Sequence, residues 1–218
     1  MKSGKQWTSF NQDCRSCTRL SNFLDEVSDK YPEYHARPVA PFGDAKASFL
    51  IVGLAPGMHG ANATGRPFTG DHAGVLLYET LFKYGFSNQP EATAKEDGLK
   101  LLNCRITNAV KCLPPQNKPT TAEITTCNHY LKDELEQMPE GAVILALGKI
   151  AHDAVLRARG KKLSAYRFGH AAVHDMEGMT LYDSYHCSRY NTQTRRLTTD
   201  MFESLFGEVR AAVDTLKR

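Results

Sequence analysis

The sequence has 218 residues, of which 41% are hydrophobic and 23% are charged, and its 27 basic and 24 acidic side chains give a formal net charge of +3. A chain of this length fits one large domain, and we expect residues 1–218 to form it. No apolar run approaches the roughly 20 residues of a membrane span, and the polar start Met1–Phe10 lacks the core of a signal peptide. We therefore expect a cytoplasmic protein whose six cysteines serve a purpose other than disulfide bonds.

Apolar periodicity predicts a chain of alternating helices and strands. In chain order, the expected elements are a helix after Cys17, a strand over Ala47–Leu54, a helix from Val75 to near Gly85, a strand over Arg105–Lys111, a helix capped by Thr120 and Glu123, a strand over Ala142–Leu147, a helix from Gly148 to about Ala158, a hairpin over Ala171–His186 and a last helix from Thr198 or Thr199. This alternation indicates an α/β fold with an open, mostly parallel sheet between helical layers.

A glycine-rich loop from Gly53 to Gly74 connects the first strand to the second helix. It is far longer than most such connections, and long loops at the ends of buried strands are where α/β proteins bind ligands. The loop contains one aromatic residue, Phe68, which we expect to be exposed. It lacks the G-x-G-x-x-G of dinucleotide-binding proteins, and Arg66-Pro67 stands where a Walker loop has Lys and Ser or Thr.

The predicted ligand site lies beyond the carboxyl ends of the parallel strands. Four segments follow strands there: the long loop, Thr107–Pro115, Gly148 and His186–Leu197. We expect them to converge on one site.

Basic residues gather in two parts of the chain. The segment Lys149–Arg167 has six basic residues against the single acid Asp153, and Ser184–Thr199 has three arginines and no acid. Local positive fields of this kind suit a polyanion such as DNA. Two solvated surfaces would have the same composition, so charge alone leaves both interpretations open.

Four cysteines form a candidate metal site. Cys14 and Cys17 make a C-x-x-C pair, and Cys112 and Cys127 follow far downstream. Four thiolates could bind zinc or an iron–sulfur cluster, and spacing alone does not choose between them. The other two cysteines, Cys104 and Cys187, are not expected to be ligands. His170 and His174 have the spacing of an H-x-x-x-H pair but lack the glutamate of a zinc protease.

Three motifs carry a resemblance to a known family. They are GLAPGMHGANATGRPFTGD from Gly53, TNAVKCLPPQNKP from Thr107 and HCSRYNTQTRRLT from His186, together with Cys14, Cys17, Cys112 and Cys127. These motifs resemble those of the iron–sulfur uracil-DNA glycosylases, most of all the family 5 branch, often called type B. The sister family 4 has an acid after the first glycine of the first motif, where this chain has Leu54. The third motif usually reads His-Pro-Ser, where this chain has Cys187 in place of the proline.

The resemblance implies a three-layer α/β/α sandwich with a structural [4Fe–4S] cluster on the four cysteines. It also implies a monofunctional enzyme of base-excision repair that flips a deaminated base out of DNA and hydrolyses its N-glycosidic bond. Uracil is the expected base, with hypoxanthine and xanthine as further substrates that the sequence does not rank. We expect the protein to act as a monomer on DNA.

The resemblance also assigns roles to residues of the predicted site. Phe68 would stack on the flipped base, and Gly53 and Ala55 would line the base pocket. Asn108 would bind the edge of the base, and His186 would donate a hydrogen bond to its departing oxygen. As the third candidate catalytic residue, Asp71 would orient water or stabilise the sugar cation, although its position before a helix equally suits an N-cap.

Residues after His186 are candidates for contacts with DNA. They are Ser188, Arg189, Tyr190, Asn191 and Arg195. Two other functions remain open for the sequence as a whole: a catalytically silent, metal-stabilised module that binds DNA, and a small-molecule enzyme that uses the long loop for a phosphate.

Overall fold

The computed structural model describes residues 10–216. Most of the segment Met1–Phe10, for which we expect no signal peptide, lies outside the described residues. Within them, no helix is both long enough and apolar enough to cross a membrane.

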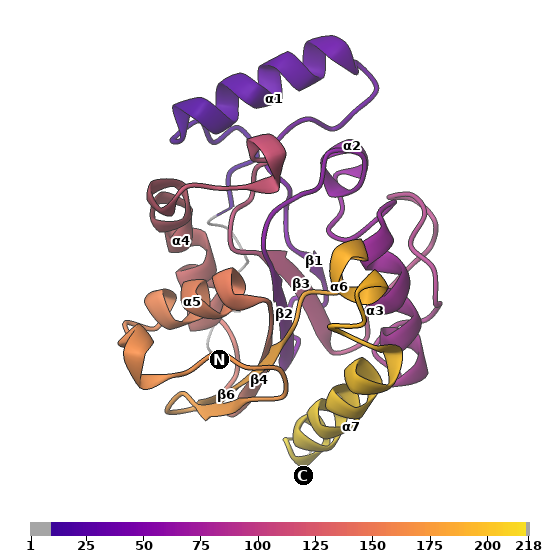
Figure 1. Ribbon diagram of the computed structural model, residues 1–218, viewed down its shortest axis with the longest axis vertical. Coiled ribbons are helices and arrows are strands. Elements are labelled where there is room, and N and C mark those ends of the chain that lie inside the picture. The colour runs from indigo at the N-terminus through magenta and orange to yellow at the C-terminus, as the bar shows by residue number, and fades with distance from the viewer. Residues whose placement is uncertain (1–9, 217–218) are drawn as a thin grey trace, which may run out of the picture.

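A six-stranded sheet forms the centre of the fold (Figure 1). Its strands, in spatial order, are β1 (Phe42–Gly43), β3 (Cys104–Asn108), β2 (Phe49–Gly53), β4 (Ala142–Leu147), β6 (Met179–Ser184) and β5 (Val173–Asp175). The four central strands are parallel, whereas β1 and β5 pair antiparallel at the two edges. The predicted mostly parallel sheet is therefore confirmed.

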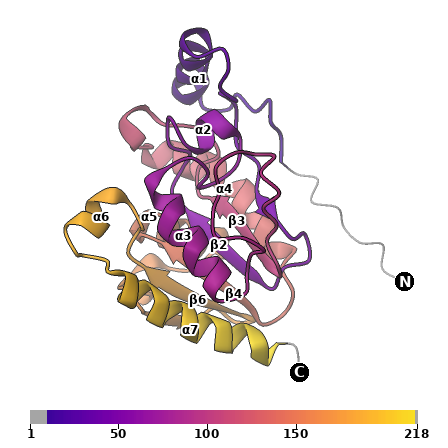
Figure 2. The same cartoon turned by 90° about the vertical axis from the view of Figure 1, so that its right-hand side faces the viewer.

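Two helical layers cover the sheet (Figures 1 and 2). One face packs against α4 (Thr121–Glu136) and α5 (Lys149–Ala158), and α1 (Thr18–Lys30) extends the same core cluster. The other face packs against α3 (His72–Lys83) and α7 (Thr199–Thr215). Alternate residues of β2 and β4 enter the two clusters, which explains why these strands are apolar on both faces. The predicted α/β/α sandwich is confirmed.

Most predicted elements occur where the sequence placed them. The strand Ala142–Leu147 has the expected bounds. The hairpin predicted over Ala171–His186 is present and turns at Gly178, but its strands cover only Val173–Asp175 and Met179–Ser184. The capping box of Thr120 and Glu123 begins α4, and Thr198 caps α7.

Several predicted elements differ from the structure, and the strand predicted over Ala47–Leu54 spans only Phe49–Gly53. The helix predicted from Val75 begins at His72, because Asp71 caps it before its apolar pattern starts. The strand predicted over Arg105–Lys111 ends at Asn108, although Ala109 and Val110 still donate backbone hydrogen bonds to the long loop. The long loop itself contains a single helical turn, α2 (Ala61–Thr64), and a second short helix, α6 (Arg189–Gln193), lies where the sequence predicted only a loop.

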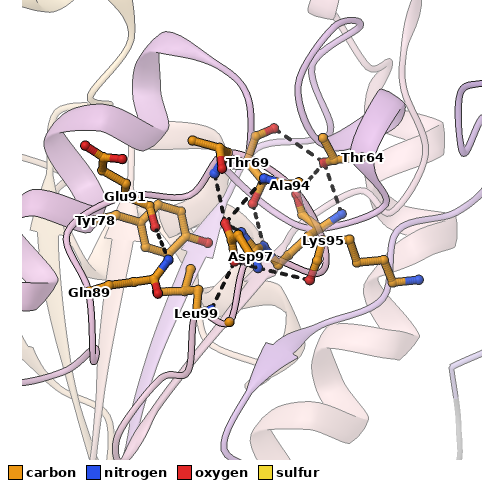
Figure 3. Close-up of polar contacts among 12 residues, drawn as sticks. Thr64, Thr69, Tyr78, Gln89, Glu91, Ala94, Lys95, Asp97 and Leu99 are labelled. Atoms are coloured by element: carbon orange, nitrogen blue, oxygen red, sulfur yellow. Dashed lines mark hydrogen bonds and ion pairs between the residues drawn. The ribbon is translucent and has the colours of Figure 1, made fainter.

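A buried ion pair fixes the long loop to the segment after α3. The Arg66 guanidinium binds both carboxylate oxygens of Asp97, at 2.8 and 2.6 Å. The exposed fractions of the two side chains are only 3% and 10%. Backbone N–H groups of Ala94 and Leu99 also donate to Asp97, which stands at the centre of this network (Figure 3). The network gives the irregular segment between α3 and β3 a fixed conformation.

Replacing Asp97 by asparagine should destabilise the protein by about 3 kcal/mol, because the buried Arg66 charge loses its counter-ion. The hydrogen bonds from Arg66 hold the pKa of Asp97 well below its ordinary range. The pair therefore contributes stability above the ordinary pKa of 3.8 and loses it as the pH falls below that value. Urea denaturation of Asp97→Asn, with the exposed neighbour Glu96→Gln as control, measures the effect; equal losses in both variants would contradict it.

Candidate active site

A pocket of about 520 Å³ opens at the carboxyl ends of the parallel strands. All four segments that the sequence predicted to converge there contribute to its lining: the long loop with the start of α3, the end of β3, the start of α5 and the segment after β6. Of the predicted site residues, Ala55, Phe68, Asp71, Asn108, His186, Ser188 and Arg189 line this pocket.

The floor of the pocket is built from tightly packed residues of β2, β3 and the long loop. Gly53 and Asn108 are paired in the parallel ladder of β2 and β3. A Cβ atom at Gly53 would lie 2.4 Å from Asn108 Oδ1 and 2.7 Å from the Phe68 ring, so only glycine fits there. Similarly, a Cβ atom at Gly74 would lie 1.9 Å from the Phe68 carbonyl oxygen. The absence of a side chain at Gly53 thus leaves room for both Asn108 and the Phe68 ring beside β2.

The expectation that Phe68 is exposed is wrong. Only 6% of the residue is exposed, and its backbone has a φ of 53°, a conformation that few residues other than glycine adopt. This backbone turns the ring inward, where it joins the core cluster on the α3 face while still lining the pocket.

Asn108 lines the pocket and carries a buried acceptor atom. The residue is 4% exposed, and among the described residues its Oδ1 atom has no hydrogen-bond partner. A buried carbonyl without a partner is costly, at about 1–3 kcal/mol. An acceptor of this kind can take a hydrogen bond from a donor that is not part of the described chain.

His186 follows β6 by two residues and faces Phe68. The two rings are nearly parallel, with an interplanar angle of 27° and centroids 6.0 Å apart. Burial lowers the pKa of His186 to about 4, so the ring is neutral at physiological pH. The Asn191 side chain donates a hydrogen bond of 2.8 Å to the His186 carbonyl oxygen, which anchors the backbone of the segment that carries the ring.

Asp71 is both a helix cap and a pocket residue. Its Oδ1 atom accepts a hydrogen bond of 2.9 Å from the Gly74 backbone and so caps α3. Its other oxygen lies against the long loop, where a Cβ atom at Gly60 would come within 2.6 Å of Oδ2. Burial raises the pKa of Asp71, although the backbone hydrogen bonds to the carboxylate oppose the shift. One oxygen is thus committed to the helix, and the second is not used by the cap.

The short helix α6 forms one rim of the pocket. Ser188 caps it by accepting from the Asn191 backbone N–H, and the rim is tied to α3 by a contact of 3.1 Å between His72 Nε2 and Thr192 Oγ1. Tyr190 is 70% exposed, and Arg189 is also exposed. Arg195, beyond the helix, is likewise exposed and has a φ of 56°. The sequence grouped Asn191 with these residues, but its side chain points back to the His186 carbonyl.

The candidate site residues from the sequence did not include several residues of the pocket, among them His72, Asn117, Lys149 and Ile150. Lys149 and Ile150 follow Gly148 directly, so their nearness to the site could have been read from that glycine. Asn117 belongs to a 3-10 turn, η1 (Pro115–Asn117), that no local pattern places at the pocket.

The four cysteines of the predicted metal site share a second pocket. It lies beside α1 and α4 and is lined by Cys14, Cys17, Cys112 and Cys127. All four are free thiols, whereas Cys104 and Cys187 are buried elsewhere. Burial, followed by the neighbouring thiols, raises the pKa of Cys112 to about 12. The Lys111 backbone N–H donates to Cys127 Sγ at 3.4 Å.

Comparisons with known proteins agree with the resemblance of the motifs. The profile of the Uracil DNA glycosylase superfamily matches residues 40–210. The type-5 uracil-DNA glycosylase of Thermus thermophilus is 45% identical over 90% of this chain and 92% of its own length. The type-5 enzyme of Pyrobaculum aerophilum is 40% identical over 93% of this chain and 89% of its own.

The sister branch is more distant. The type-4 uracil-DNA glycosylase of Thermotoga maritima is 31% identical over 74% of this chain and 77% of its own length. The prediction from the motifs, including the preference for family 5, is confirmed. The chain belongs to the uracil DNA glycosylase superfamily and, within it, to the type-5 uracil-DNA glycosylases.

Proposed function

We propose that the protein is a DNA repair hydrolase that removes uracil from DNA in the pocket described above and leaves an abasic site. One observation carries the assignment of this pocket: the buried Oδ1 atom of Asn108 has no partner among the described residues. The N3–H group of a flipped uracil is a donor that this oxygen can accept, and the Asn108 amide N–H can donate to the neighbouring carbonyl of the base. The chain would act as one domain and as a monomer.

The base would enter the pocket by leaving the DNA stack, as glycosylases generally require. Phe68 would stack on the base, since its ring lies against Gly53 and its backbone carbonyl lies against Gly74. Ala55 and Gly53 leave room because neither has a bulky side chain. His186 is neutral and so can donate an N–H to the base oxygen on which negative charge develops as the bond breaks.

Release of free uracil from DNA tests this function directly. The protein is incubated with oligonucleotides that contain a single uracil, hypoxanthine or xanthine, and release of the free base is measured. We expect release of uracil. The oligonucleotides with hypoxanthine and xanthine show whether the pocket also accepts purines. Binding of the uracil oligonucleotide without release would instead support the silent DNA-binding module, and absence of both would support a small-molecule enzyme.

Asp71 is proposed to act on water or on the sugar cation through the oxygen that the helix cap does not use. Asparagine caps helices about as well as aspartate, whereas alanine does not. Asp71→Asn should therefore keep the thermal stability and slow single-turnover excision by about 100-fold or more. Asp71→Ala should slow excision and also lose about 1 kcal/mol of stability. If Asp71→Asn excises uracil at the parent rate, the residue is only a cap.

The exposed residues of the α6 rim are proposed to contact DNA in two different ways. Removing a phosphate contact, as in Arg195→Ala, should weaken binding to all sequences and reduce the salt slope by about one unit. Removing a side chain that fills the gap left by the flipped base, as in Tyr190→Ala, should spare that slope and impair excision from duplex DNA more than from single strands. Parent-like behaviour of both variants on both substrates would place this rim away from DNA.

The four cysteines are proposed to hold a structural [4Fe–4S] cluster. A tetrahedral zinc ion with Zn–S bonds of about 2.3 Å would bring its sulfurs within about 3.8 Å of one another. Among the described residues, the set of three or more ligand atoms within 4.8 Å of one another is His152, His174 and Asp183, and it includes no cysteine. All four thiols nevertheless line one pocket, an arrangement that suits a cluster held by four thiolates. Such a cluster would link α1 to α4 and the segment after β3.

A further inference from the structure

A second group of potential metal ligands lies outside both pockets. His152 on α5, His174 on β5 and Asp183 on β6 place their ligand atoms within 4.8 Å of one another. His152 Nδ1 is 2.8 Å from Asp183 Oδ1, and His174 Nε2 is 3.1 Å from Asp183 Oδ2. The exposed fractions of the three side chains are 1%, 13% and 0%, so the group is almost sealed from water.

The hydrogen-bond partners of His152 determine which of its two ring nitrogens carries the hydrogen. Its Nε2 atom is 3.1 Å from the Tyr166 carbonyl oxygen, which can only accept, so Nε2 carries a hydrogen. In the neutral ring, Nδ1 then presents a lone pair to Asp183 Oδ1, a second acceptor, at 2.8 Å. Two acceptors this close need a cation between them, either a proton or a metal ion. A backbone carbonyl on the far nitrogen is also the usual partner of a metal-binding histidine.

Asp183 also requires a cation beside it. Its carboxylate is fully buried, and in the described part of the chain its ion-pair partners are these two histidines. A buried carboxylate is costly unless a positive charge is close to it. Each of its oxygens faces a different imidazole, so one cation bound among the three groups would contact all of them.

We propose that His152, His174 and Asp183 bind a divalent transition-metal ion, with Zn²⁺ as the ion that two imidazoles and one carboxylate suit best. Metal–ligand bonds of about 2.1 Å in a tetrahedron separate the ligand atoms by about 3.4 Å. The observed separations of 2.8 and 3.1 Å, with all atoms inside 4.8 Å, need only small side-chain adjustments to reach that geometry. The ion would join α5 to the β5–β6 hairpin, on the strand that leads to His186.

The test uses Co²⁺ as a spectroscopic probe on protein that retains its full iron content, after dialysis against a chelator. We expect one equivalent of Co²⁺ to bind, with visible d–d absorption, without the near-ultraviolet charge-transfer band of a thiolate ligand, and with a rise in Tm. His174→Gln and His152→Gln should each lose this binding. His170→Gln, which changes a histidine of the same segment outside the group, should keep it.

Three results would overturn the proposal. Absence of Co²⁺ binding by the parent protein would mean that a proton alone closes the network. Unchanged binding in both His174→Gln and His152→Gln, or a thiolate charge-transfer band in the parent, would place the ion elsewhere. Circular dichroism shows whether each variant is folded, and the parent titration decides the question even where a variant is not.

Discussion

Replacing His186 by alanine should slow single-turnover excision of uracil by about 10²–10³-fold, the usual effect of removing one donor to a developing negative charge. DNA binding should change much less, because this hydrogen bond strengthens only as the base departs. His186→Gln retains an N–H group and should recover part of the rate. Equal rates for His186→Gln and His186→Ala would argue that the ring acts through packing against Phe68 rather than as a donor.

The pH dependence of excision offers a separate check on His186. Because burial lowers its pKa to about 4 from an ordinary 6.5, titration of this ring should not change the rate between about pH 6 and 8. The same pKa shift predicts how the stability of the fold depends on pH. The unfolded chain takes up the proton first as the pH falls, so the stability contributed by the neutral ring is present above about 6.5 and is lost towards pH 4. A rate that follows an ordinary histidine titration would contradict a donor that is neutral in this range of pH.

Replacing Cys127 by serine should abolish the cluster and the native fold together. The proposed cluster links segments from three parts of the chain, and metal binding of this kind is coupled to folding. We expect an almost complete loss of bound iron, loss of the brown colour and insoluble protein. Iron analysis and the soluble yield measure both outcomes.

Cys104→Ala is the matched control for this experiment. Cys104 is buried like Cys127 but lies outside the pocket of the four thiols. It should keep the iron content even if packing suffers. A Cys127→Ser variant that is soluble, active and free of iron would contradict the assignment of a structural cluster. Zinc in place of iron in the parent protein would show that the four cysteines bind a zinc ion instead.

The parts of the fold that depend on local sequence could be predicted well. The strand Ala142–Leu147 is a continuous apolar run with a parallel neighbour on each side, so its pattern leaves little choice. The start of α4 could also be predicted, because Thr120 and Glu123 form a capping box that is visible in the sequence. Elements fixed by distant contacts were harder to predict. The short helix α6 is too brief to have a period, and its Ser188 cap looks like any loop serine.

The candidate site shows the same division. The convergence of four segments followed from the parallel order of the strands, and Asp71, Asn108 and His186 lie at the pocket as expected. The burial of Phe68 did not follow, because a positive φ at a residue other than glycine leaves no mark in the sequence. Asn117 reaches the pocket from a turn that begins at the second of two prolines, and only the path of the folded chain brings it there. The roles of these residues in catalysis remain predictions.

The short connection between Asn108 and Cys112 would make the base pocket sensitive to oxidation of the proposed cluster. Only three residues, all buried, separate the side chain proposed to bind uracil from a proposed cluster ligand. The backbone of the last of them, Lys111, donates to the sulfur of a second proposed ligand, Cys127. An oxidant that removed iron would release this segment without touching the base pocket chemically. If the proposed cluster is present, removal of uracil should then fail until the cluster is reassembled.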